Sequence, residues 1–237
     1  MKIVEKITRR QFDQHGNPPV TIAFIGDSVT QGCFECDYKP EVGFFGPCEY
    51  RNGFANHLLN FLHLLCPTAQ INLINAGIGG DSAPGGLARF DRDVGAFHPD
   101  LVIIGYALND SGQGAAGLDT YQNAMSALVE KTLALGAECI VLTPNCMNDR
   151  VSPSLDHEVM RNTAAAFTQV DLDLYVDAAK AVAAGHGVPV CDVYAKWQSW
   201  RRAGVNVTEL LANKLNHPVR ELHYLTAMLI AETMFEA

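Results

Sequence analysis

The residues best suited to chemistry in this sequence directly follow its first apolar run. Thr21 to Ile25 are apolar or β-branched and predict a buried strand, and Gly26-Asp27-Ser28 comes next. A serine is therefore expected at the carboxyl end of a strand, the edge of a parallel sheet where ligands and catalytic groups collect. A serine hydroxyl becomes a nucleophile when a base takes its proton, so Ser28 requires a histidine.

The best candidate for that base is His217, one of eight histidines. It lies in the polar segment 215–218, just before the last predicted helix, and that helix can bring its N-terminal end to the active edge of the sheet. Acyl transfer by such a pair also needs N–H donors directed at the developing oxyanion. The backbone N–H of Ser28, the turn from Gly77 to Gly80 and the side-chain amide of Asn109 can supply them.

Each of these segments also has a purely structural interpretation. Gly-Asp-Ser after a strand is common as a turn and helix cap, and glycine-rich turns often serve backbone geometry alone. Asn109 and Asp110 after a strand can form an ordinary helix N-cap, and a single loop histidine is usually solvated. The functional interpretation therefore depends on the conjunction of these segments at successive strand ends.

Alternating strands and helices are expected to position these residues. The predicted strands are 21–25, 71–76, 101–107, 139–144 and 188–194, and the predicted helices are 54–65, 82–94, 118–135, 156–184 and 219–235. Asp81 or Ser82 can cap the second of these helices. The order predicts one α/β domain over residues 1–237, with a mostly parallel five-stranded sheet covered by helices on both sides. Residues 1–19 are expected to be a peripheral lead-in.

A long connection, residues 31–50, separates the first strand from the first predicted helix. It is rich in glycine, proline, cysteine and aromatic residues. Long connections of this kind are often functional, so part of the substrate wall is expected here. A packed surface excursion is the alternative.

Composition limits the partners and the compartment. Apolar residues make up 48% of the chain and charged residues 18%, and no window approaches the ~20 continuous apolar residues of a membrane helix. The formal net charge of −9 argues against nucleic acid or an anionic membrane as a partner. The charged N-terminus does not resemble a signal peptide, so a cytoplasmic protein is expected. A homo-oligomer is compatible with the sequence, which does not define the oligomeric state.

The seven cysteines show no regular spacing. Reduced thiols are the expectation for a cytoplasmic protein. A zinc site is the alternative for three of them, Cys33, Cys36 and Cys48, but no fourth ligand is evident nearby.

Four short segments resemble the sequence blocks of the SGNH hydrolase superfamily, also called GDSL-type esterases and lipases. They are GDSV at 26–29, NAGIGGDS at 75–82, ALND at 107–110 and NHP at 216–218. The resemblance spans nearly the whole chain, from Thr21 to Phe235. It implies a flavodoxin-like three-layer α/β/α sandwich and hydrolysis of a carboxylic ester through an acyl-enzyme, with no metal or organic cofactor.

The resemblance also implies roles for individual residues. Ser28 corresponds to the nucleophile and His217 to the general base. The N–H groups of Ser28 and Gly80 and the amide of Asn109 correspond to the oxyanion hole. Asp27 corresponds to the aspartate of the family's GDS motif and is expected to brace the turn. His223 matches a histidine common in the closing segment and is expected to be structural.

The sequence departs from the family pattern at two positions. Ala107 stands where a glycine is usual, two residues before the asparagine, and this is expected to tilt the loop slightly. Lys214 stands where the family usually has an aspartate, three residues before the histidine. The usual acid of the triad is therefore missing.

A lysine side chain cannot accept the Nδ1–H of an imidazole, but a backbone carbonyl can. Some SGNH enzymes are similar in working as a Ser-His dyad with a carbonyl in the place of the acid, and the Lys214 carbonyl is expected to take that role. The side chains of Asn213 and Asn216 are alternative acceptors. Asp192 is another, although it is expected to be a helix cap. Modest turnover is expected without the acid.

The function expected from the resemblance is hydrolysis of a short acyl ester, such as acetyl on a sugar or small alcohol. Two alternatives stay open. The acyl group can pass to an alcohol other than water, which would make the protein an acyltransferase. With Lys214 and Ala107 at these positions, the chain can also be a catalytically weak member that binds a carbohydrate or a partner.

Overall fold

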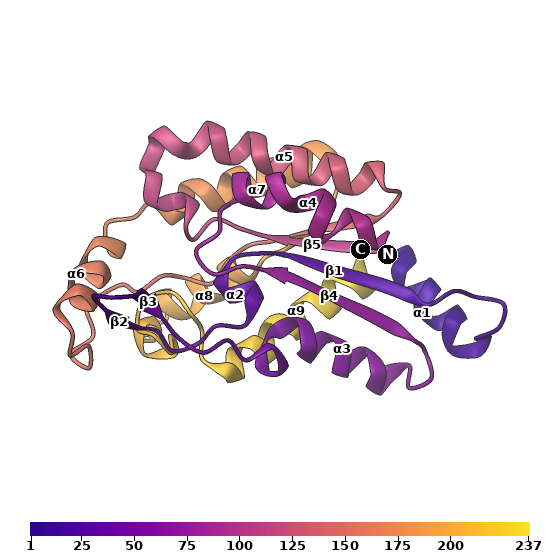
Figure 1. Ribbon diagram of the computed structural model, residues 1–237, viewed down its shortest axis with the longest axis horizontal. Coiled ribbons are helices and arrows are strands. Elements are labelled where there is room, and N and C mark those ends of the chain that lie inside the picture. The colour runs from indigo at the N-terminus through magenta and orange to yellow at the C-terminus, as the bar shows by residue number, and fades with distance from the viewer.

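The sheet at the centre of the computed structural model, which describes residues 1–237, has five strands. They are β1 (Val20–Gly26), β4 (Ile71–Gly77), β5 (Leu101–Gly105), β6 (Glu138–Leu142) and β7 (Val190–Cys191). Their order across the sheet is β4, β1, β5, β6, β7. Figure 1 labels the first three of these strands. The predicted five-stranded sheet is therefore confirmed, with every neighbouring pair parallel and β7 shorter than expected.

Helices cover both faces of this sheet (Figure 1). One face carries α3 (Phe54–Leu65) and α9 (Arg220–Glu236), and the other carries α4 (Ala83–Asp93), α5 (Leu118–Ala134) and α7 (Leu172–His186). Residues 22–25 of β1 and 101–104 of β5 are fully buried, as expected for parallel strands packed on both sides. The predicted flavodoxin-like three-layer sandwich is confirmed. None of its helices has the length and apolar character needed to cross a bilayer.

A small layer lies beyond the carboxyl ends of the strands. It contains the antiparallel hairpin of β2 (Asp37–Lys39) and β3 (Gly43–Phe45), together with α6 (Glu158–Phe167) (Figure 1). The Tyr38 ring lies 5.1 Å from the His157 ring and packs against a small apolar cluster. The cluster consists of Leu155, Met160, Ala164 and Leu215. This contact connects the hairpin to α6.

The N-terminal segment is a helix of the core, so the prediction of a peripheral lead-in is wrong. Helix α1 (Lys2–Phe12) places Ile3 and Ile7, four residues apart, on one buried face. Lys6 pairs with Asp100 at 2.7 Å, just before β5. Charged residues surround the two isoleucines, so the narrow apolar stripe of α1 is difficult to recognise in the sequence. In the structure, this stripe covers the amino-terminal edge of the sheet.

The single helix expected over 156–184 is two helices, α6 and α7, separated by 168–171. The Asp171 side chain accepts a hydrogen bond from the Leu174 N–H at 3.3 Å and begins α7. Helix α7 runs through Gly185 and ends at His186, where Gly187, with a φ of 65°, forms the C-cap. The break turns α6 toward the hairpin, which a continuous helix could not reach.

The sequence did not predict α8 (Val193–Arg202), which follows β7. Asp192 caps this helix by accepting from the Ala195 N–H at 3.0 Å, as predicted for that residue. Short 3-10 helices occur at Tyr50–Asn52, Gly95–Phe97, Asp110–Gly117 and Val207–Leu210.

We expect Ile7→Ala to lower the free energy of unfolding by about 2 to 4 kcal/mol, because it leaves a cavity in the core. The control is Phe12→Ala on the same helix, where the side chain is 85% exposed and the cost should stay below about 0.5 kcal/mol. Urea denaturation measures both variants. Equal, small effects would contradict the placement of α1 in the core.

Candidate active site

The serine turn is formed by the close approach of β1 to its neighbours. A Cβ at Gly26 would lie 2.5 Å from the Gly105 carbonyl oxygen, so only glycine fits at the end of β1. Asp27 then caps the short helix α2 (Ser28–Gln31) by accepting from the Val29 N–H at 2.9 Å. Ser28, the first residue of this helix, is largely buried at the carboxyl edge of the sheet.

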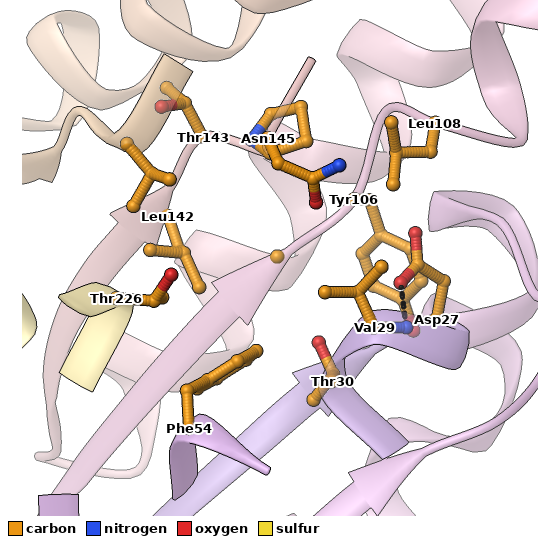
Figure 2. Close-up of a pocket in the computed structure, with 13 residues that line it drawn as sticks. Asp27, Val29, Thr30, Phe54, Tyr106, Leu108, Leu142, Thr143, Asn145 and Thr226 are labelled. Atoms are coloured by element: carbon orange, nitrogen blue, oxygen red, sulfur yellow. Dashed lines mark hydrogen bonds between the residues drawn. The ribbon is translucent and has the colours of Figure 1, made fainter. Parts of the chain in front are cut away.

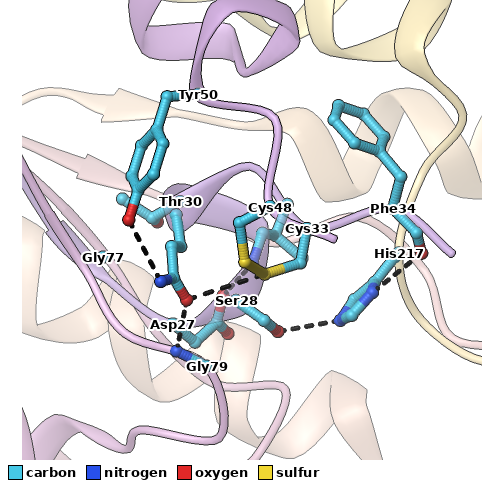
Figure 3. Close-up of a disulfide and its surroundings, with 12 residues drawn as sticks. Asp27, Ser28, Thr30, Cys33, Phe34, Cys48, Tyr50, Gly77, Gly79 and His217 are labelled. Carbon is cyan, nitrogen blue, oxygen red and sulfur yellow. Dashed lines mark hydrogen bonds between the residues drawn. A yellow bond between two sulfur atoms is a disulfide. The ribbon is translucent and has the colours of Figure 1, made fainter. Parts of the chain in front are cut away.

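His217 reaches this serine from the far end of the chain. Its Nε2 lies 2.8 Å from the Ser28 Oγ, and its Nδ1 lies 3.0 Å from the carbonyl oxygen of Phe34 (Figure 3). Because a carbonyl can only accept, Nδ1 must carry the proton, which leaves the lone pair of Nε2 to accept from the Ser28 hydroxyl. This is the tautomer that a general base requires.

The prediction that the Lys214 carbonyl orients the histidine is wrong. A backbone carbonyl does face Nδ1, but Phe34 supplies it from the connection after α2. Lys214 lies in the left-handed region, with a φ of 57°, and its ammonium pairs with Glu209 at 2.9 Å. The tight turn around Lys214 presents the ring of His217 outward, toward the serine, so the acceptor comes from another segment.

The two asparagines considered as acceptors brace this turn instead. The Asn213 Oδ1 accepts from the backbone N–H groups of Leu215, Asn216 and His217 at 3.0, 3.0 and 2.9 Å. Its Nδ2 donates to the Asn216 Oδ1 at 3.0 Å. One buried side chain therefore satisfies three consecutive N–H groups and fixes the backbone of His217. Asp192 lies at the start of α8, where it pairs with Lys180.

The three proposed oxyanion donors line the same cavity as His217. Ser28, Gly80 and Asn109 all contribute to its wall. Gly80 has a φ of 76°, a conformation that favours glycine. The Asn109 Nδ2 donates to the carbonyl oxygen of Asp81 at 2.8 Å, which fixes the orientation of the amide.

A buried arginine, which was not predicted from the sequence, stabilises the ends of the two strands that lead into the serine turn and the glycine turn. Arg89 donates to the carbonyl oxygens of Gly26 and Ala76 at 3.1 and 2.6 Å, at the ends of β1 and β4. It also donates to the Asp81 carboxylate at 2.8 Å, and Tyr106 shares that carboxylate. Arginine is ordinarily an exposed residue, so its type in the sequence gave no signal of this buried role.

The cavity beside Ser28 has a volume of about 500 Å³. The connection 31–50 forms much of its wall, with Gln31, Glu35 and the aromatic rings of Phe44 and Phe45. The opposite wall comes from α6 and from the turn before α9, and the Phe167 ring contributes to it. The long connection is therefore part of the cavity that contains the Ser-His pair, as predicted for it.

The sequence profile of the GDSL-like Lipase/Acylhydrolase family matches residues 24–224. The chain belongs to this family. The match includes the serine turn, Gly80, Asn109 and the His217 segment, which the structure places around one cavity.

Two curated relatives match part of the chain. The acetylxylan esterase of Geobacillus stearothermophilus is 30% identical over 132 residues, which cover 52% of this chain and 58% of the relative. Esterase TesA of Pseudomonas aeruginosa is 36% identical over 70 residues, or 30% of this chain and 34% of the relative. Each alignment spans less than two thirds of the relative.

Solved structures share the fold at low sequence identity. A two-domain esterase active on acetylated mannans superposes with a TM-score of 0.69 at 20% identity, covering 99% of this chain and 52% of that one. A lipase/acylhydrolase from Enterococcus faecalis superposes with a TM-score of 0.66 at 20% identity, covering 90% and 94%. This chain thus spans about half of the two-domain esterase.

The unusual alanine of this GDSL-family chain sits in a strained conformation. Ala107 is fully buried with a φ of 137°, a region that side chains with a Cβ rarely adopt. The glycine usual at this position would relieve that strain. Asn109 nevertheless reaches the cavity, and Asp110 accepts from the Ala83 N–H at 2.9 Å. This carboxylate, and not the side chain of Asp81 or Ser82, caps α4.

Asp27 faces away from the cavity that contains the Ser-His pair. It borders a small internal cavity of about 30 Å³ with Thr30 and Asn145, among apolar side chains (Figure 2). Burial raises the pKa of Asp27 to about 7, and the neighbouring Asp110 contributes to the shift. Its contacts are those of a helix cap under the serine, in agreement with the expected bracing role.

Two of the cysteines are paired, so the expectation of seven reduced thiols is wrong. Cys33 and Cys48 form a disulfide between the two sides of the 31–50 connection (Figure 3). The pairing occupies two of the three cysteines considered for zinc. Their separation of 15 residues carries no recognisable spacing, and the β2–β3 hairpin, which reverses the chain between them, brings them together.

His223 is placed as expected for a structural residue. It is buried in α9, and its Nδ1 accepts from the Phe54 N–H at 3.2 Å. Its ring lies 4.7 Å from the ring of Phe34. Burial lowers the pKa of His223 to about 3, so the ring is neutral. It packs against the side chain of Phe34.

The raised pKa of Asp27 predicts a pH-dependent cost to stability. Between its ordinary value of 3.8 and about 7, the folded carboxyl keeps a proton that the unfolded chain releases, so stability falls as the pH rises through this window. Asp27→Asn keeps an oxygen for the Val29 N–H but has no charge. We expect the variant to gain about 1 to 4 kcal/mol relative to the wild type between pH 4 and pH 8, measured by urea denaturation.

Asp93→Asn is the control with the opposite sign. Its hydrogen bonds with Arg92 and Arg89 lower the pKa of Asp93 below the ordinary 3.8, so that variant should lose stability relative to the wild type as the pH rises toward about 4 and show no further change between pH 4 and pH 8. The same pH dependence in Asp27→Asn and the wild type would contradict the assignment.

Proposed function

We propose that the protein hydrolyses a carboxylic ester through an acyl-enzyme on Ser28. The observation that carries this proposal is the 2.8 Å contact between the Ser28 Oγ and a His217 ring whose other nitrogen faces a carbonyl. Membership of the GDSL-like Lipase/Acylhydrolase family supports it.

In the acylation half-reaction, the Ser28 Oγ attacks the ester carbonyl carbon while the Nε2 of His217 takes the hydroxyl proton. The N–H groups of Ser28 and Gly80 and the amide of Asn109 then stabilise the oxyanion. When the carbon–oxygen bond to the alcohol breaks, Nε2 gives its proton to the leaving oxygen. In the second half, His217 activates a water molecule that releases the acid and restores the serine.

The electrostatics of the pair suit this role. Burial lowers the pKa of His217, and the hydrogen bond to the Phe34 carbonyl offsets part of that shift. The imidazole is therefore neutral near pH 7 and ready to accept a proton. The Phe34 carbonyl is uncharged, so it stabilises the imidazolium less than a carboxylate would, and modest turnover is expected.

We propose an acetylated sugar as the substrate class. Two similar proteins support it, the acetylxylan esterase and the esterase active on acetylated mannans. The wall of the cavity, with aromatic rings from Phe44 and Phe45 and polar groups from Gln31 and Thr163, suits the apolar faces and hydroxyls of a sugar. The cytoplasmic location and the absence of a nucleic-acid partner stay predictions.

We expect the purified protein to hydrolyse p-nitrophenyl acetate, and Ser28→Ala and His217→Ala each to lose at least about 10³-fold in kcat/KM, because each removes half of the nucleophile–base pair. Thermal unfolding of both variants controls for loss of the fold. Butyrate and octanoate esters test the acyl length, and acetylated xylo-oligosaccharides test the sugar.

A folded wild type no faster than Ser28→Ala on all of these esters would contradict the proposal. It would favour the catalytically weak binding member considered from the sequence. Transfer to an added alcohol in preference to water would instead identify an acyltransferase using the same residues.

A further inference from the structure

The disulfide lies in the short segment that joins the proposed nucleophile to the group that orients the proposed base. The Cys33 N–H donates to the Ser28 carbonyl oxygen at 2.9 Å. The next residue is Phe34, whose carbonyl oxygen accepts from the Nδ1 of His217 at 3.0 Å. Figure 3 shows the disulfide beside Ser28 and His217. A displacement of Cys33 would therefore move the acceptor of the histidine.

The Cys48 side of the disulfide is itself anchored. The Glu49 N–H donates to the Gly32 carbonyl oxygen at 2.8 Å, and Cys33 and Cys48 form an isolated antiparallel bridge. The Glu49 carboxylate pairs with Arg220 in the first turn of α9. The disulfide thus links the Phe34 segment to the Cys48–Glu49 segment, which is itself paired with α9.

Other contacts hold the side chain of Phe34, and the Glu35 carboxylate on the far side of its peptide group pairs with Arg220 at 2.7 Å. The ring is fully buried, 4.7 Å from the His223 ring and 4.4 Å from the Arg220 guanidinium carbon. A ring held in this way still permits rotation of the adjacent backbone. The direction of the Phe34 carbonyl is set by the dihedral angles on either side of the Phe34–Glu35 peptide. The position of that peptide depends on the preceding residue, Cys33, which the disulfide restrains.

We infer that the Cys33–Cys48 disulfide is the positioning group for the proposed hydrolysis. The disulfide holds the Phe34 carbonyl against His217. This carbonyl takes the place of the aspartate that the family usually has three residues before the histidine. The inference rests on the proposed function and adds a dependence on thiol oxidation: the enzyme is faster with the disulfide formed than with it reduced. Both cysteines line the cavity of Ser28, so a small thiol can reach them.

A dithiol such as dithiothreitol supplies the two electrons for the reduction. One of its thiolates attacks a disulfide sulfur, the second closes the oxidised ring, and two protonated cysteine thiols remain. Cys36 lines the same cavity three residues after Cys33. Cys33 and Cys48 are therefore replaced together, so that neither is left as a single thiol beside Cys36.

The test compares oxidised wild type, wild type reduced with dithiothreitol, and Cys33→Ser/Cys48→Ser. Each is assayed with p-nitrophenyl acetate below its unfolding temperature, and free thiols are counted by mass spectrometry after alkylation of separate aliquots. We expect reduction to lower kcat about 5- to 100-fold with KM within about twofold, because the base is displaced while the cavity stays. The double variant should have the same kcat as the reduced wild type, and dithiothreitol should not change that kcat.

Reoxidation of the reduced wild type should restore kcat. Cys66→Ser, which removes a free thiol at the end of α3, controls for effects of the dithiol elsewhere and should respond as the wild type does. Reduction of the folded wild type keeps the test valid even where the double variant does not fold.

An unchanged kcat in the reduced, folded protein would overturn the inference. A loss that accompanies unfolding would also overturn it, since the disulfide would then act on the fold and not on the position of a carbonyl. If the oxidised wild type is no faster than Ser28→Ala, the proposed function itself fails, and the two failures are thereby distinguished.

Discussion

The hydrogen bond between the Nδ1 of His217 and the Phe34 carbonyl is the interaction on which the arrangement of the site depends. A carbonyl accepts and never donates, so this bond alone fixes the tautomer and directs the lone pair of Nε2 at Ser28. Without an acceptor on this side, a buried imidazole would have no preferred orientation. The usual aspartate would provide the same orientation together with a negative charge.

Much of the surrounding structure holds the two ends of this bond. On one side, Gly32 reverses the chain, and the buried ring of Phe34 and the Cys33–Cys48 disulfide place the carbonyl. On the other side, Asn213 satisfies three consecutive N–H groups and fixes the His217 backbone. The polar groups are buried but paired, which removes most of the cost of placing them in the interior.

The sheet and the cavity-facing residues could be predicted from the sequence because each leaves a mark on residue type. Strands buried on both faces read as apolar runs, and Ser28, Gly80, Asn109 and His217 lie in four recognisable blocks. The structure brings all four to one cavity.

The rest could not be predicted, for physical reasons particular to each element. Any residue can supply a carbonyl, so nothing in Phe34 marks it as the acceptor, and it lies 183 positions from His217. The disulfide depends on the β2–β3 hairpin, which reverses the chain between the two cysteines. The apolar stripe of α1 consists of two isoleucines among charges, and the break between α6 and α7 depends on the capping side chain of Asp171. In each case, contacts with residues distant in the sequence decide a conformation or a pairing that the local sequence does not define.

The Phe34 carbonyl sets the protonation of the His217 ring, and the ¹⁵N spectrum of the His217 imidazole near pH 7.5 tests this. We expect a neutral ring protonated at Nδ1, with Nε2 free to accept from Ser28. A ring protonated at Nε2, or one that exchanges freely between both tautomers, would contradict this assignment.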